Sequence, residues 1–174
     1  GGTWSQQGHL IADDHSLGDL FGHSVAISGD LIVVGAPSDR TDAGMDAGSA
    51  YVFARSGGTW SQQDHLYAGD AAADAEFGDA VAISGDTIVV GTRLDSTVAA
   101  SGSGSAYVFT RAGGTWSQQD HLIANDAGVD DGFGESVALD GDTVVVATGD
   151  DDTAAGNDAG SAYVYVLSFL DLFV

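Results

Sequence analysis

Short apolar runs separated by glycine-rich turns make up almost the whole chain. In the first 56 residues these runs fall at residues 3–11, 24–28, 31–36 and 49–55. β-Branched and aromatic residues dominate all four runs, which is typical of strands. No stretch shows helical periodicity. The pattern therefore predicts an all-β protein.

The turns between these runs indicate how the strands pair. Gly29-Asp30 separates the second run from the third, and such a two-residue turn favours a tight hairpin. Ser56-Gly57-Gly58 joins the fourth run to the next apolar run and predicts a second hairpin. The run at residues 31–36 is apolar on both faces, as expected of a strand sandwiched between neighbouring sheets.

A repeat of 56 residues organises the sequence. Trp4, Trp60 and Trp116 are 56 residues apart, and the copies 1–56, 57–112 and 113–168 align without a gap, with 27 of 56 columns identical. Four strands in about 50 residues is the size of a propeller blade. We predict three four-stranded antiparallel blades of the β-propeller type, with the tryptophans and Phe21, Phe77 and Phe133 in the layers between blades, followed by an apolar tail at 169–174.

The composition narrows the functional classes. The chain has 26 acidic residues, four arginines and no lysine, for a net charge of −22, so we expect no nucleic-acid partner and no binding to anionic membranes. No apolar run reaches the roughly 18 residues that span a bilayer, and we expect no membrane insertion. The sequence starts at Gly1 rather than Met, as expected of a processed or truncated product.

The sequence resembles a known family at two short motifs. Phe21-Gly22 followed by Gly35-Ala36-Pro37 matches the pattern for which FG-GAP repeats are named. The later copies keep Phe77-Gly78 and Phe133-Gly134, whereas their GAP positions have become Gly91-Thr92-Arg93 and Ala147-Thr148-Gly149. The arrays of bacterial surface and secreted proteins are most similar, and the integrin α propeller is more distantly similar. The resemblance implies a propeller fold, an extracellular location and an adhesive or scaffolding role.

Calcium-binding members of that family carry an acidic loop between the FG and GAP strands, and residues 27–31 are a bare hairpin there. The resemblance therefore implies no calcium cage at this place. Other acids follow the GAP strand, where the second copy keeps only Asp95 and a cation site needs convergent oxygens. We interpret these acids as solvated loops and expect no metal and no cofactor. They are Asp39, Asp42, Asp46, Asp150, Asp151, Asp152 and Asp158.

No catalytic constellation stands out from the repeat. His9, His65 and His121 occupy one repeat position, and catalysis does not need three copies, so we expect a structural hydrogen bond there. His15 and His23 lack partners at metal-ligand spacing. The sequence has no nucleophile elbow and no phosphate loop. We predict that the protein is not an enzyme.

The phase of the repeats predicts self-assembly. The first apolar run has no local partner, and the third copy lacks its fourth strand, so one chain's residues 3–11 complete the third sheet of another chain. The expected product is an extracellular ring or filament. The alternative is a carbohydrate- or protein-binding propeller module, with the Trp-Ser-Gln-Gln strand as a sugar-binding face. Residues 168–174 are either a remnant or an edge-covering strand. The predicted interface comprises Trp4, Gln6, His9, Leu10, Tyr163, Tyr165, Leu167 and Phe169.

The acidity has two interpretations, solubility and adaptation to high salt. Under the second, the melting temperature rises from low salt towards molar salt, because screening shortens the reach of carboxylate repulsion from about 10 Å at 0.1 M to about 3 Å at 1 M. Thermal unfolding followed across that range checks the prediction. A melting temperature that stays flat or falls contradicts it, and a dependence on micromolar calcium makes the acidic loops metal sites.

Overall fold

The computed structural model describes residues 2–167, which form three antiparallel sheets with strands in chain order. The first sheet contains β1 (Ser24–Ser28), β2 (Leu31–Ala36), β3 (Ser49–Ser56) and β4 (Thr59–Leu66). The second contains β5 (Ala80–Ser84), β6 (Thr87–Thr92), β7 (Ser105–Ala112) and β8 (Thr115–Leu122). The third contains β9 (Ser136–Asp140), β10 (Thr143–Thr148) and β11 (Ser161–Val166).

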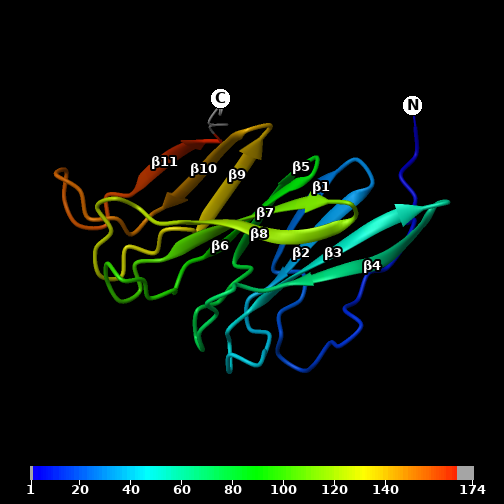
Figure 1. The fold of residues 1–174 in the computed structure, drawn as a ribbon, viewed down its shortest axis with the longest axis horizontal. Helices are drawn as coiled ribbons and strands as arrows, with labels where there is room; N and C mark the ends of the chain where they lie inside the picture. Colours follow the sequence, from blue (N-terminus) through cyan, green and yellow to red (C-terminus); the bar gives the residue numbers. More distant parts are fainter. Residues whose placement is uncertain (1, 168–174) are drawn as a thin grey trace, which may run out of the picture.

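The three sheets lie side by side like splayed blades (Figure 1). β5 packs against both β1 and β9, whereas β4 and β8 at the other edges scarcely meet. The sheets are therefore closest at their first strands and diverge towards their last. The predicted all-β fold is confirmed for the described residues, and the sheets are not closed into a barrel.

Each four-stranded sheet crosses a repeat boundary. The turn at Gly57 and Gly58, both at positive φ, returns β3 into β4, which belongs to the second copy. β3 and β4 pair with Tyr51 opposite His65, and a bulge falls between Val52 and Phe53. β7 and β8 repeat this arrangement one copy later. The third sheet has three strands among the described residues.

Residues 3–11 form no strand, contrary to the prediction. The closely similar sequence of the later copies forms β4 and β8 because β3 and β7 pair with it, whereas among the described residues no strand pairs with residues 3–11. Trp4 is fully exposed, so its predicted place between blades is wrong. Trp116, Phe77 and Phe133 are buried as predicted.

The core lies between the sheets. In the first joint, Val33 and Val52 of the first sheet face Ile88 and Val90 of the second, and all four are fully buried. The Phe77 ring also belongs to this layer and meets the ring of Tyr107 at a tilt, with centroids 5.6 Å apart. β2 and β6 are buried along almost their whole length, as their apolar sequences predict.

The Phe-Gly pair brings two backbones into direct contact at each joint. The Phe77 amide donates to the Ala47 carbonyl at 3.0 Å. A Cβ added at Gly78 would lie 2.3 Å from the Ser49 carbonyl oxygen, and one added at Gly35 would lie 2.0 Å from the Gly78 carbonyl oxygen. Only residues without a side chain permit this approach, so the FG and GAP glycines face each other across the joint.

The second joint repeats this contact between Gly91 and Gly134. Each end sheet makes this contact on its inner side and lacks it on its outer side. A Cβ added at Gly22 would meet no atom within 4 Å, because no sheet precedes the first one among the described residues. At the other end, the position equivalent to Gly35 and Gly91 is Ala147.

The joint predicts that alanine at Gly78 lowers the stability of the fold more than alanine at the equivalent Gly22. Gly22 and Gly78 have nearly the same φ, +96° and +99°, so alanine costs each about 1–2 kcal/mol of backbone strain. Gly78→Ala adds a backbone clash worth about 1–3 kcal/mol more. Urea unfolding at low protein concentration measures both variants, and an equal loss of stability would show that the joint tolerates a side chain.

Candidate functional site

A cluster of polar side chains recurs where the third strand meets the fourth in both four-stranded sheets. In the first sheet the Tyr51 and His65 rings stack with centroids 4.2 Å apart. The Tyr51 hydroxyl donates to Asp39 Oδ2 at 3.0 Å, and the Ser49 hydroxyl donates to the same oxygen at 2.6 Å. His65 Nδ1 lies 3.4 Å from Asp14 Oδ2, and His65 Nε2 lies 3.4 Å from Asp39 Oδ2. The imidazole therefore sits between two carboxylates.

The second sheet repeats the cluster. Tyr107 and His121 stack at 4.3 Å, and the imidazole lies between Asp70 and Asp95 at 3.3 and 3.7 Å. Asp95 raises the pKa of the His121 imidazole against the opposing effect of burial, and Asp70 adds to the rise. Burial favours a higher pKa for the Asp95 carboxyl, but the contacts from His121, Ser105 and Tyr107 outweigh it and lower that pKa.

The third sheet has the carboxylates and the tyrosine without a histidine. The Tyr163 hydroxyl lies 3.0 Å from Asp126 Oδ1 and 3.0 Å from Asp151 Oδ2. None of the chain's five histidines stacks on Tyr163, which is half-buried where Tyr51 and Tyr107 are fully buried. Burial raises the Tyr163 pKa, and the two carboxylates raise it further.

The predicted interface residues lie on two separate parts of the molecule. Trp4, Gln6 and His9 are exposed, and Leu10 packs partly against the first sheet. Tyr163 and Tyr165 are half-buried on β11, and Leu167 is exposed just after it. Phe169 and the tail at 169–174 lie outside the described residues. Within one chain the structure does not bring the two sets together.

The internal hairpins give the register in which the two sets match. Tyr51 pairs with His65, Phe53 with Gln62, and Arg55 with Trp60. Shifted by whole repeats, these pairs become Tyr163 with His9, Tyr165 with Gln6, and Leu167 with Trp4. Ala50 opposite Leu66 becomes Ala162 opposite Leu10. Seven of the eight predicted interface residues thus fall in one ladder.

Each end sheet exposes a face that is covered inside the array. Val25 and Ile27 on β1 are 67% and 65% exposed, and they are equivalent to Val81 and Ile83, which pack in the first joint. An apolar groove runs beside them from Leu10 to Val34. On the third sheet, Val164 is 65% exposed, whereas the equivalent Val52 is fully buried.

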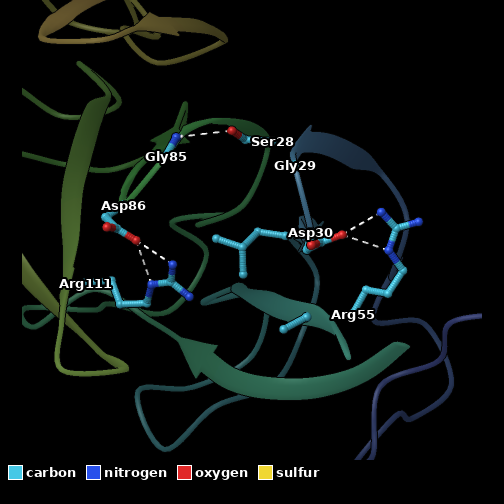
Figure 2. A pocket seen from close by; sticks show the side chains of 9 residues that line it. Ser28, Gly29, Asp30, Arg55, Gly85, Asp86 and Arg111 are labelled. Carbon is cyan, nitrogen blue, oxygen red and sulfur yellow. Dashed lines mark hydrogen bonds and ion pairs between the residues drawn. The ribbon is translucent and has the colours of Figure 1, made fainter. Parts of the chain in front are cut away.

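A shallow hollow of about 460 Å³ lies between the β1–β2 and β5–β6 turns (Figure 2). Arg55 donates through Nε and Nη2 to Asp30, and Arg111 donates in the same way to Asp86. Each arginine in the hollow is neutralised by its own aspartate. Both arginines also cover tryptophan rings, with Arg55 lying 5.2 Å from the Trp60 centroid. The hollow therefore marks the rim of a joint, with no unpaired charge to attract a ligand.

Comparison with known families agrees with this geometry. The FG-GAP repeat profile matches residues 4–53, 60–109 and 116–165, and each match includes the Phe-Gly pair of one blade. The chain belongs to the FG-GAP repeat family. Such repeats are typical of propeller-like extracellular or binding modules. The comparison with curated proteins found no match. No helix in the described residues has the length and apolar character to cross a membrane.

The aspartates of the polar clusters are a feature of this chain's repeat that sequence reasoning missed. Asp39, Asp95 and Asp151 were expected in solvated loops, but they are only 8%, 8% and 3% exposed. Their 56-residue spacing was the available signal, since scattered loop acids do not recur. The spacing also holds for Asp14, Asp70 and Asp126. Among residues 2–167, no group of three or more potential ligand side chains is arranged to hold a metal ion.

The buried aspartates predict a large stability effect. Asp95→Ala leaves the Ser105 and Tyr107 hydroxyls without their acceptor, at about 1–3 kcal/mol for each buried donor. Asp86→Ala removes only an exposed pair with Arg111, worth about 1 kcal/mol or less. Urea unfolding compares the two variants. Similar losses would mean that the cluster is not a significant source of stability.

Proposed function

We propose that this FG-GAP chain is a non-enzymatic extracellular scaffold that assembles head-to-tail. Residues 3–11 of one chain pair with β11 of another and complete its third sheet. The observation that carries the proposal is a matched pair of features. Among residues 2–167 no strand covers the outer edge of β11, and the sequence of residues 3–11 closely resembles the one that forms the edge-covering strands β4 and β8.

The open edge has a physical need for a partner. An exposed edge strand presents unpaired N–H and C=O groups and accepts another strand readily. β11 has the sequence Ser-Ala-Tyr-Val-Tyr-Val, which differs from the first six residues of β3 only at Tyr165 and Val166. The ladder described above places His9, Gln6 and Trp4 along it. Trp4 then lies on Leu167, an apolar contact in place of the Trp60–Arg55 stacking.

The exposed faces support the same arrangement. Pairing at β11 brings the first sheet of the second copy towards the outer face of the third sheet. Val25 and Ile27 of that copy approach Val164, as Val81 and Ile83 approach Val52 within the chain. Burying apolar surface contributes about 25 cal/mol per Å². The contact between chains is therefore continuous with the joints already present inside the chain.

One residue weakens the fit. Inside the chain, the FG carbonyl reaches the Cα of Gly35 or Gly91 so closely that a Cβ there would lie 2.0 Å from it. In the third sheet this position is Ala147. The Phe21-Gly22 turn of a second copy must move away from the methyl group. We therefore expect a reversible association that is looser than the internal joints.

The contact joins different surfaces of the two chains, so it is heterologous and propagates. If the rotation closes, two chains give a ring of six blades, within the usual range of about four to eight. If it does not close, the chains form a filament of similar blades. Either product suits a structural or adhesive protein outside the cell, the kind of setting typical of FG-GAP repeats.

Sedimentation of the intact chain over a range of concentrations tests the proposal. Trp4→Ala removes a fully exposed side chain, so the monomer keeps its stability while the association weakens. Ala147→Gly removes the obstructing methyl group, and the association strengthens. Leu17→Ala is the matched control, because Leu17 is equally exposed but lies outside the pairing segment. We expect it to leave association unchanged.

Two results would overturn the proposal. An intact chain that stays monomeric at all attainable concentrations would show that β11 does not recruit a second copy. An association that responds alike to Trp4→Ala and Leu17→Ala would show that copies meet through another surface.

A further inference from the structure

We propose that Asp126, Asp151 and Tyr163 form the acceptor site for His9 of a second copy of this chain. The inference rests on the head-to-tail assembly proposed above and adds the interaction that fixes its register. It assigns the partner side chain by its chemistry, a planar cation with two N–H donors.

The first two repeats supply the template. In each of them an imidazole stacks on a tyrosine, with interplanar angles of 13° and 15°. Each imidazole directs one nitrogen towards Asp14 or Asp70, which lies 51 residues earlier in the chain. The other nitrogen faces the aspartate that follows the GAP strand, Asp39 or Asp95. The geometry is nearly identical in both. The cluster is therefore a property of the repeat.

The third repeat has the tyrosine and both carboxylates of this cluster without an imidazole. Asp126 and Asp151 both lie within 3.0 Å of the Tyr163 hydroxyl, which has a single proton to donate. One hydroxyl cannot satisfy two carboxylates, and two like charges in one place repel. An imidazolium between them supplies a positive charge and two donors. It also covers the exposed face of Tyr163.

His9 is the side chain that the register delivers. It is exposed, and the ladder that pairs Tyr51 with His65 places it opposite Tyr163. His65 and His121 follow Asp64 and Asp120, and the amide of each histidine is hydrogen-bonded to that neighbour. His9 follows Gly8 instead, so it brings no carboxylate of its own into a site that already has two.

The site makes association depend on pH, with a definite sign. The groups that face the imidazole are the carboxylates of Asp126 and Asp151 and the hydroxyl of Tyr163, and no arginine is within ion-pair distance of either aspartate. The carboxylates favour protonated His9, as Asp95 raises the pKa of His121. Because the contact favours the protonated imidazole more than the free chain does, association strengthens as pH falls and weakens as pH rises.

Sedimentation between pH 5.5 and 8.5 tests the inference on the intact chain. One proton per contact allows the dissociation constant to rise by up to about tenfold per pH unit in the sensitive window. We expect His9→Gln to abolish most of this pH dependence and to weaken association at pH 6. His15→Gln is the matched control, because His15 is also exposed in the first copy and contacts only the Ala12 carbonyl. Its pH profile should match that of the unaltered chain.

Asp151→Asn gives a second test from the receiving side. It removes one of the two charges, so the pH dependence should shrink as it does with His9→Gln, and combining both variants should add little. If the chain assembles but neither variant changes the pH profile, the acceptor site is wrong and the head-to-tail assembly stands. If the chain does not assemble at any pH, the proposed function itself fails.

Discussion

Contact between glycine backbones holds the sheets of this protein at their spacing. Gly78 and Gly134 each bring a carbonyl oxygen against the Cα of a glycine in the preceding sheet, closer than any side chain would allow. The amide of the phenylalanine before each of these glycines donates to a carbonyl just before the third strand of the preceding sheet. The phenylalanine ring packs in the apolar layer between the two sheets. The apolar packing between sheets and the positions of the loops depend on this approach. The FG and GAP motifs are thus two sides of one contact.

The end blades show what the contact contributes, because they carry only half of it. The first sheet has the FG turn without a preceding sheet, and Gly22 is open where Gly78 is enclosed. The third sheet has a GAP strand in which Ala147 replaces the glycine, and its outer face exposes Val164 and Val166. The residues of these two faces are equivalent, by the 56-residue repeat, to residues that pack in the joints between sheets. The proposed assembly uses them, with Ala147 as the feature that limits its strength.

The polar clusters have a different place in the fold from the glycine joints. They lie where the third strand of a sheet meets the fourth, and they tie together side chains from two repeats and two loops. Asp39 and Asp95 are buried and accept hydrogen bonds from serine hydroxyls, while His65 and His121 each lie within ion-pair distance of one of them and of a second carboxylate. The cluster therefore registers the fourth strand against the third. The same chemistry, divided between two chains, would register an assembly.

Much of this could be read from the sequence. The repeat length, the strands at 24–28 and 31–36, the Gly29-Asp30 hairpin and the return through Gly57 and Gly58 are local features, set by residue periodicity and turn chemistry. Burial of Phe77 and Phe133 also followed, because a large apolar side chain at a repeated position has few other places to go. The family could be named from the FG and GAP motifs, which are short runs of neighbouring residues.

Other features depended on contacts between distant segments. Residues 3–11 closely resemble β4 and β8, yet they form no strand, since a strand exists only with a partner for its ladder. Asp39 and Asp151 look like loop acids until Tyr51 and Tyr163 are placed beside them. The glycines of the joint look like turn residues until the opposing backbone is seen. Strands, turns and the repeat arise from neighbouring residues, so they could be read from the chain directly. Whether an edge, a face or a carboxylate stays open depends on another segment lying against it, and this followed only from the folded arrangement.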